Sequence, residues 1–321
     1  MESTRDDELV RQAAPTWRRY LTALWRDKIT LFALLVLLFF IVAAFLPSWI
    51  ATHDPLSQSL RLRNQPPMTP TTDGTGIPHL LGTDPLGRDL FSRLIFGARV
   101  SLSVGFAGVV VSGTIGVLLG MTAGFVRGKA DDLIMRAVDL TMGLPFLVLA
   151  IFVLHVIGGG LINIVGILAL VRWPLYARVS RGLTLALSET SIIEAARSIG
   201  CSRRRIIFRH LLPNLTSPMV VLGTLEVARM ILAEASLSFL GLGIQPPQPS
   251  WGLMISDGRP YIRQAWWVIM FPGVAILLTA LSANLLATWL RAVTDPAQRW
   301  RWLTGGRKAR REAAAREGGI T

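Results

Sequence analysis

The chain has 321 residues, of which 51% are hydrophobic and 17% are charged, and its mean hydropathy is +0.49. A soluble domain carries about 25% charged residues, whereas here the apolar residues gather in long uncharged stretches. This composition excludes a soluble globular enzyme and a disordered chain, and it is typical of a polytopic membrane protein. In a soluble chain, the net charge of +13 would suggest binding to nucleic acid. Here the basic residues lie mainly in the segments between the apolar stretches, where positive charge determines membrane topology. We therefore predict contact with the lipid bilayer and no nucleic-acid partner.

Six apolar stretches are predicted to cross the membrane as helices, which gives an all-α integral membrane protein. The first, Ile29–Ile50, has 22 residues without a charge. As a helix it would reach about 33 Å, enough for a bilayer core of about 30 Å. The other five are Ser101–Val126, Leu140–Gly160, Leu161–Ala177, Leu215–Gly243 and Ala265–Leu290.

Lysine and arginine predict which side each connecting segment faces. With both termini inside, the inner segments hold 23 of these residues and the outer segments hold 7. This asymmetry favours cytoplasmic termini in a bacterial inner membrane. The predicted organisation is a cytoplasmic segment 1–28, a first span 29–50, an extracytoplasmic loop 51–100, a five-helix core 101–291 and a basic cytoplasmic tail 292–321.

The outer loop begins irregularly and then changes character at Asp84-Pro85. Asp84 is predicted to cap a helix whose first position is Pro85, because proline there loses no needed hydrogen bond. Apolar residues recur beyond it with helical spacing, which predicts a helix lying in the outer interface or on the protein's own surface.

The inner segment 178–213 carries the most informative motif. It contains Glu194-Ala195-Ala196, then Gly200, three arginines (Arg203, Arg204 and Arg205), and His210 followed by Leu-Leu-Pro213. The small alanines permit close approach of a partner, Glu194 suits the start of a short helix, and Gly200 suits a sharp turn. Pro213 fits the first turn of the next membrane helix. We predict a rigid helix–turn–helix that docks onto a cytosolic partner.

This motif resembles the cytoplasmic loop of ABC importer permeases, and His210 before Leu-Leu-Pro resembles the dipeptide/oligopeptide/nickel branch of that family. Three further stretches resemble the same branch, in particular its C-type permease. They are the outer stretch Leu81–Arg99, with Gly82, Asp84, Gly87, Arg88, Asp89 and Arg99, the stretch Gln245–Gly252, and Leu290-Arg291 with Asp295-Pro296.

The resemblance implies the type I importer arrangement, with a coupling helix seated on an ATPase subunit. It implies three kinds of partner: a second homologous permease, two cytoplasmic ATP-binding subunits and an extracytoplasmic solute-binding protein. The sequence contains no Gly-x4-Gly-Lys-Ser/Thr phosphate loop, since Gly128-Lys129 continues with Ala130. The chain is therefore predicted to be a transport subunit rather than an enzyme, and to need no cofactor. With Cys201 as its single cysteine, it is also predicted to hold no metal.

Ionisable residues at bilayer depth are candidates for the translocation path or for subunit contacts. Glu226 and Arg229 lie three residues apart and can pair, Glu234 follows on the same helix, and Arg172 is expected to reach toward the inner interface. Asp139 is expected to pair with Arg136.

Short peptides are the predicted substrate, with nickel, glutathione or another small solute as alternatives within the family. Two other classes of protein compete. An intramembrane enzyme lacks a His-Glu-x-x-His or Gly-x-Ser-x-Gly motif. An ion-coupled carrier would use Glu226 or Glu234, but it would have no ATPase to dock.

Overall fold

The computed structural model describes residues 24–294, apart from 26 and 72–75. The predicted N-terminal segment 1–28 and the basic tail 292–321 lie almost wholly outside the described residues, as does Asp295-Pro296. Within the described part the chain is helical, with two isolated backbone bridges and no strand. The predicted all-α fold is confirmed.

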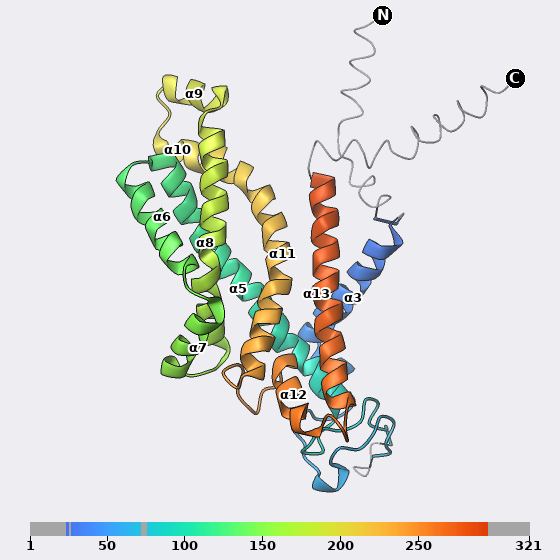
Figure 1. Ribbon diagram of the computed structural model, residues 1–321. Helices are drawn as coiled ribbons and strands as arrows, with labels where there is room; N and C mark the ends of the chain where they lie inside the picture. Colours follow the sequence, from blue (N-terminus) through green and yellow to red (C-terminus); the bar gives the residue numbers. More distant parts are fainter. Residues whose placement is uncertain (1–23, 26, 72–75, 295–321) are drawn as a thin grey trace, which may run out of the picture.

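Five long helices form the bundle, and shorter helices complete it at its two ends and along one side (Figure 1). The long helices are α3 (Lys28–Phe45), α5 (Leu90–Val126), α8 (Leu161–Ser188), α11 (Leu212–Phe239) and α13 (Trp267–Thr294). The shorter elements are α4 (Pro47–Ile50), η1 (Leu60–Leu62), α6 (Lys129–Met142), α7 (Phe146–Ile157), α9 (Ser191–Ser198), α10 (Arg203–Ile206), η2 (Ile207–Leu211), α12 (Trp251–Gly258) and η3 (Arg259–Tyr261). One end of the bundle carries α9 and α10, and the opposite end carries α12 and the segment between α4 and α5.

Four helices, α3, α5, α8 and α13, are long and apolar enough to cross a membrane, and the bent pair α6 and α7 adds a fifth candidate. The remaining predicted span corresponds to α11, which has 28 residues but carries Glu226, Arg229 and Glu234. It packs against both α5 and α13, within the bundle. All six predicted stretches thus coincide with helices of the bundle, although their bounds differ from the prediction.

The first span ends earlier than predicted. α3 stops at Phe45, and Leu46 has the non-helical angles φ −122° and ψ 49°. The cause is Pro47, because a proline ring disfavours the helical conformation of the residue before it. The chain resumes as the short α4, so the prediction of one helix from Ile29 to Ile50 was wrong at its end.

The third span is not a straight helix from Leu140 to Gly160. α6 and α7 meet at an angle of 89° across Gly143–Pro145. Pro145 cannot continue the hydrogen-bond ladder of α6, and Gly143 relaxes the turn before it. The two helices also differ in composition. α6 is amphipathic and carries charged residues, whereas the 12 residues of α7 are almost all apolar.

The second span is longer than predicted, because its helix also includes most of the residues expected in the interfacial helix. α5 runs without a break for 37 residues from Leu90, which corresponds to about 55 Å. Its N-cap is Asp89, whose side chain accepts a hydrogen bond from Ser92 N, and not Asp84. The prediction of a separate helix beginning at Pro85 was therefore wrong.

The core of the fold depends on a close approach between α5 and α8. Gly116, Gly120 and Gly124 recur at four-residue spacing on the side of α5 that meets α8. A methyl group at Gly120 would lie 2.8 Å from the carbonyl carbon of Ala177, closer than real Cβ atoms come to other atoms. Small residues of this spacing allow membrane helices to pack backbone against backbone.

Candidate functional site

The predicted docking segment, residues 178–213, lies at one tip of the bundle (Figure 1). Its first part continues α8 to Ser188, beyond the predicted end of the fourth span at Ala177, and α9 follows after a two-residue turn. Glu194 lies in the first turn of α9, where the helix dipole favours a negative charge. The predicted short helix with an acidic start is thus present.

One face of α9 is buried and the other is open. Ile193 and Ala196 are 3% and 6% exposed and pack into a small core formed with Met121, Leu211 and Leu215. Ile192, Glu194 and Ala195 are exposed on the opposite face. Of the two alanines predicted to admit a partner, only Ala195 is therefore accessible; Ala196 holds α9 onto the bundle instead.

Gly200 makes the sharp turn that the sequence predicted. Its φ of +78° lies in the left-handed region that glycine tolerates best. Ser202 then caps α10 by accepting a hydrogen bond from Arg205 N at 3.4 Å. Arg203, Arg204 and Arg205 form an exposed basic turn that follows α9 in the chain.

Pro213 lies in the first turn of α11, as predicted, but no break in the helix precedes it. The chain is already helical from Arg203, and α10, η2 and α11 follow one another without a gap. η2 is a π-helical turn immediately before the proline, and such a turn accommodates the missing N–H and the bulk of the ring. His210 is half-buried in this turn, and its carbonyl accepts a hydrogen bond from Asn214 Nδ2 at 2.6 Å.

A charged group lies in the middle of α11. Glu226 is fully buried, and its carboxylate lies 2.8 Å from Arg229 Nη1 and 3.5 Å from Arg172 Nε of α8. The predicted Glu226–Arg229 pair is confirmed. Arg172 was expected to extend toward the inner interface, but it joins this pair, so one buried carboxylate holds two arginines from different helices.

Glu234 has a different environment. It is fully buried and accepts hydrogen bonds from Ser238 Oγ at 2.7 Å and Ser101 Oγ at 3.2 Å. Ser101 belongs to α5 and its hydroxyl also lies 3.3 Å from Trp251 N at the start of α12. Glu234 therefore connects three elements through hydroxyl groups.

The acidic residues of α6 bind α8. Asp131 accepts two hydrogen bonds from Arg181, at 2.5 and 2.6 Å, and Asp139 accepts one from Arg178 at 2.7 Å. The expected pairing of Asp139 with Arg136 was wrong. Residues one helical turn apart were the simplest partners in the sequence, but the bend after α6 lays this helix against α8.

At the opposite end of the molecule, the outer motif folds into a buried ionic network. Asp84 lies 2.6 Å from Arg88 Nε and 3.4 Å from Arg93 Nε. Both arginines also approach Asp257 of α12, at 3.5 and 3.7 Å. Asp84 additionally accepts a hydrogen bond from Arg88 N, so it organises a tight turn instead of capping a helix. Sequence reasoning missed Asp257, which lies 164 positions further along the chain from Arg93.

The two glycines of this motif are required by close contacts. Gly82 and Gly87 both have positive φ, at +81° and +70°. A methyl group on Gly87 would overlap the carbonyl oxygen of Ser59, and one on Gly82 would lie 2.5 Å from that of Gln65. Arg99, the last member of the motif, is exposed on α5 and lies outside the network.

Burial in this network raises the pKa of the Asp257 carboxyl above its usual range. The positive charges of Arg93 and Arg88 oppose the shift, and the negative charge of Asp84 adds to it. Two carboxylates thus share two arginines in a poorly solvated place.

A bundle of membrane helices with buried charges, an exposed amphipathic helix at one tip and a folded segment at the other defines a multi-pass membrane transport subunit. The comparisons with known proteins agree with this class. Residues 116–300 match the family described as binding-protein-dependent transport system inner membrane component. Residues 16–67 match the N-terminal TM domain of oligopeptide transport permease C. The chain belongs to this family of inner-membrane transport components.

Three relatives illustrate the similarity. The chain is 42% identical to the Di/tripeptide transport system permease protein DppC of Pseudomonas aeruginosa, over 84% of this chain and 88% of the relative. It is 39% identical to the probable D,D-dipeptide transport system permease protein DdpC of Escherichia coli, over 82% and 86%. It is 40% identical to the glutathione transport system permease protein GsiD of Pectobacterium atrosepticum, over 87% and 89%.

A solved structure has the same fold. An inward-facing form of the MetNI methionine ABC transporter aligns with a TM-score of 0.54 and 20% identity, over 64% of this chain and 98% of that one. The predicted permease arrangement is confirmed. Membership of the family also confirms the prediction of a transport subunit that does not itself hydrolyse ATP, and it favours this reading over an ion-coupled carrier.

Proposed function

We propose that this chain is one of two unlike membrane subunits of an ATP-driven importer of short peptides. An ATPase and a solute-binding protein are partners that the family implies, and we propose two ATP-binding subunits and one homologous permease as the complete set. The names of the relatives support the substrate class, since dipeptides, tripeptides and glutathione are all short peptides or close analogues.

The proposed orientation places both termini and the docking segment in the cytoplasm. The distribution of 23 inner against 7 outer basic residues supports it. The start of α3 and the end of α13 lie at the same end of the bundle as α9 (Figure 1), as an even number of crossings requires. The segment between α4 and α5, together with α12, would then face the solute-binding protein.

The observation that carries the proposed coupling role is the open face of α9. Ile192 in α9 is 66% exposed, and Ile199, the residue that caps its C-terminus, is 79% exposed, although the other face of α9 is anchored to the bundle. Exposed aliphatic side chains beside Glu194 and the basic turn of α10 suit a groove on a protein partner. We assign Glu194, Ala195 and Gly200 to contact with the ATPase, Arg203, Arg204 and Arg205 to the rim, and Ala196, His210 and Pro213 to support of the segment.

We assign Arg172 and Arg229 to the translocation path or to the second permease. Both side chains are anchored on Glu226 yet remain 31% and 59% exposed, so their guanidinium groups are accessible from outside this subunit. Cationic groups positioned by a buried carboxylate could contact a peptide carboxylate. Glu234 has no accessible surface and is assigned a structural role.

The function is tested with the assembled importer in proteoliposomes, by measuring ATP hydrolysis and uptake of labelled dipeptide together. Glu194→Ala should keep the complex assembled but lower peptide uptake per ATP hydrolysed. Asp132→Ala is the control, because Asp132 is an exposed acidic residue of α6 that lies outside the docking segment. Equal coupling in the two variants would remove the docking assignment, and uptake without ATP would contradict the proposed function.

The orientation is tested separately by cysteine labelling in spheroplasts. Cys201 is replaced by serine, and Ser198→Cys or Leu60→Cys is introduced at exposed positions at opposite ends of the bundle. A membrane-impermeant maleimide should label the Leu60 variant in intact spheroplasts and the Ser198 variant only after permeabilisation. The reverse pattern would overturn the orientation.

A further inference from the structure

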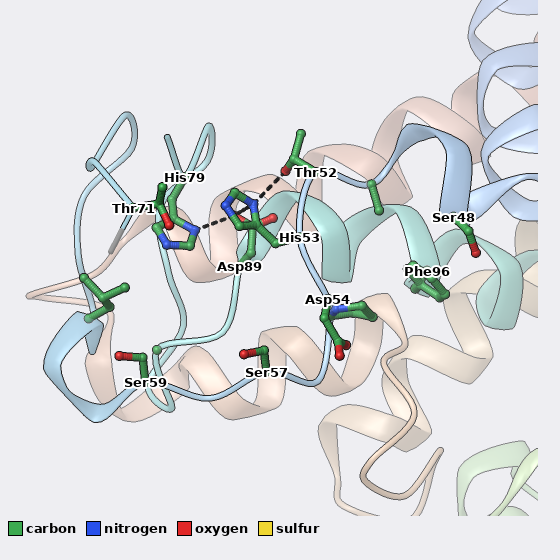
Figure 2. Close-up of a pocket in the computed structure, with 14 residues that line it drawn as sticks. Ser48, Thr52, His53, Asp54, Ser57, Ser59, Thr71, His79, Asp89 and Phe96 are labelled. Atoms are coloured by element: carbon green, nitrogen blue, oxygen red, sulfur yellow. Dashed lines mark hydrogen bonds and ion pairs between the residues drawn. The ribbon is translucent and has the colours of Figure 1, made fainter. Parts of the chain in front are cut away.

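Three potential metal ligands from distant parts of the chain converge at the N-terminus of α5. His53 follows α4, His79 lies in the segment before the outer motif, and Asp89 caps α5. Their ligand atoms all lie within 4.8 Å of one another. Figure 2 shows the two imidazole rings beside the Asp89 carboxylate, in the wall of a cavity of about 640 Å³.

The distances suit a small divalent ion. Asp89 Oδ1 lies 2.8 Å from His79 Nδ1 and 3.7 Å from His53 Nδ1. A tetrahedral Zn²⁺ with bonds of about 2.0–2.1 Å holds its ligand atoms about 3.3 Å apart, which falls between these two values. The two rings are stacked with their centroids 4.6 Å apart, so both imidazoles lie on the same side of the carboxylate oxygen.

The carboxylate is already oriented for this role. Asp89 Oδ2 accepts a hydrogen bond from Ser92 N at 2.7 Å, which fixes the side chain and leaves Oδ1 facing the histidines. Ser92 Oγ in turn accepts a hydrogen bond from His53 N at 3.0 Å and holds that segment in place. Hydrogen bonds of this kind, one shell outside the ligands, orient the donors of metal sites.

The second ring nitrogen of His79 has no part in these contacts. The His79 side chain is 6% exposed, and within the described part of the chain its Nε2 has no hydrogen-bond partner. A ring that coordinates an ion through Nδ1 keeps its proton on this second nitrogen and so binds as a neutral imidazole.

We propose that His53, His79 and Asp89 form a binding site for a divalent transition metal of the Zn²⁺ class, with a fourth position open to the cavity. Two nitrogen ligands and one oxygen favour Zn²⁺, Ni²⁺ or Cu²⁺ over Mg²⁺ and Ca²⁺, which prefer oxygen alone. A bound ion would fasten two loops to the first turn of α5. The site is independent of the proposed function, so either can fail without the other.

The experiment uses the full chain purified in detergent through a tag without histidine. After chelator treatment and dialysis, Zn²⁺ is added, and its stoichiometry and affinity are measured by elemental analysis and calorimetry. We expect one Zn²⁺ per chain, and at least a tenfold loss of affinity in His53→Gln and in His79→Gln. The chain has four histidines, so His155→Gln and His210→Gln are matched controls that should bind as the parent chain does.

A second measurement covers the case in which the variants fail to fold. X-ray absorption of the Zn²⁺-loaded parent chain should show two imidazole ligands and oxygen neighbours, and Zn²⁺ should raise its melting temperature. The proposal is overturned if the parent chain retains no stoichiometric Zn²⁺, if the absorption spectrum lacks imidazole, or if the cluster and control variants bind equally.

Discussion

The close approach of α5 and α8 predicts that Gly120→Ala is strongly destabilising. The added methyl group would lie 2.8 Å from the Ala177 carbonyl carbon and closer still to two oxygens, those of the Ala177 carbonyl and the Ser180 hydroxyl. Ordinary contact begins at 3.4 Å, so α8 must move by more than half an ångström, and its backbone cannot rotate away as a side chain can. Overpacking of this kind costs about 1–3 kcal/mol.

The sign of the effect separates packing from helix propensity. Alanine is favoured over glycine inside a helix by about 0.5–1 kcal/mol, so a glycine without neighbours should gain stability when it is replaced. Gly182 of α8 is such a position, because nothing lies within 4 Å of its added methyl group. Gly182→Ala is therefore a matched control within the same helix pair.

The assay is thermal unfolding of the detergent-solubilised chain, followed by fluorescence-detected size-exclusion chromatography. For a chain of 321 residues, 1 kcal/mol corresponds to about 1.5 °C. Gly120→Ala should lower the melting temperature by several degrees, and Gly182→Ala should leave it unchanged or raise it. If both variants melt together, the backbone contact between α5 and α8 is not as described.

Three further predictions follow from the charged groups and the outer turn. Glu226→Ala should lower the yield of monodisperse protein, because it removes charge-assisted contacts worth about 1.5–3 kcal/mol. Glu226→Gln should lower the yield less, since the amide oxygen can still accept a hydrogen bond, and equal yields of the two variants would contradict the pairing. Gly87→Ala should make the segment between α4 and α5 sensitive to protease, since its methyl group overlaps the Ser59 carbonyl, whereas Gly76→Ala, with open space around it, should change that sensitivity much less. The pKa of Asp257 is higher in the folded chain than in the unfolded chain, so folding favours the protonated carboxyl. This contribution to the free energy of unfolding is complete below the ordinary aspartate pKa and is lost as pH rises through the folded-state pKa. The melting temperature of the parent chain should therefore fall relative to that of Asp257→Asn as pH rises above about 4, and a difference that does not vary with pH would refute this.

Apolar stretches and local turn chemistry were readable from the sequence. All six predicted spans coincide with helices, one of them bent between α6 and α7, because a predominantly apolar segment in a bilayer has few alternatives to the helix. The turn at Gly200 and the acidic first turn of α9 followed from the conformational freedom of glycine and from the helix dipole. The early end of α3 was also encoded locally, since Pro47 stood in the sequence and its effect on Leu46 is general.

Contacts between residues far apart in the sequence could not be predicted from the sequence. Asp257 completes the network around Asp84, and Asp139 pairs with Arg178 instead of with the neighbouring Arg136. Neither partner is signalled by spacing, because each depends on how helices pack. The approach of His53 and His79 to Asp89 is of the same kind, since these residues lie apart in the sequence and belong to no ligand motif with short spacing.

The long, unbroken α5 gives the two ends of the molecule a common element. At one end Asp89 gathers the histidine cluster around its first turn. At the other, Phe125 packs into the core beneath α9, and the Arg197 guanidinium lies 5.6 Å from its ring centroid. A displacement of α9 would therefore be transmitted to α5 through Phe125. Between its two ends, α5 packs against α8 through its glycine face. Loosening that face with Gly120→Ala should weaken coupling between ATP hydrolysis and transport as well as stability, and Gly182→Ala should change neither for the worse.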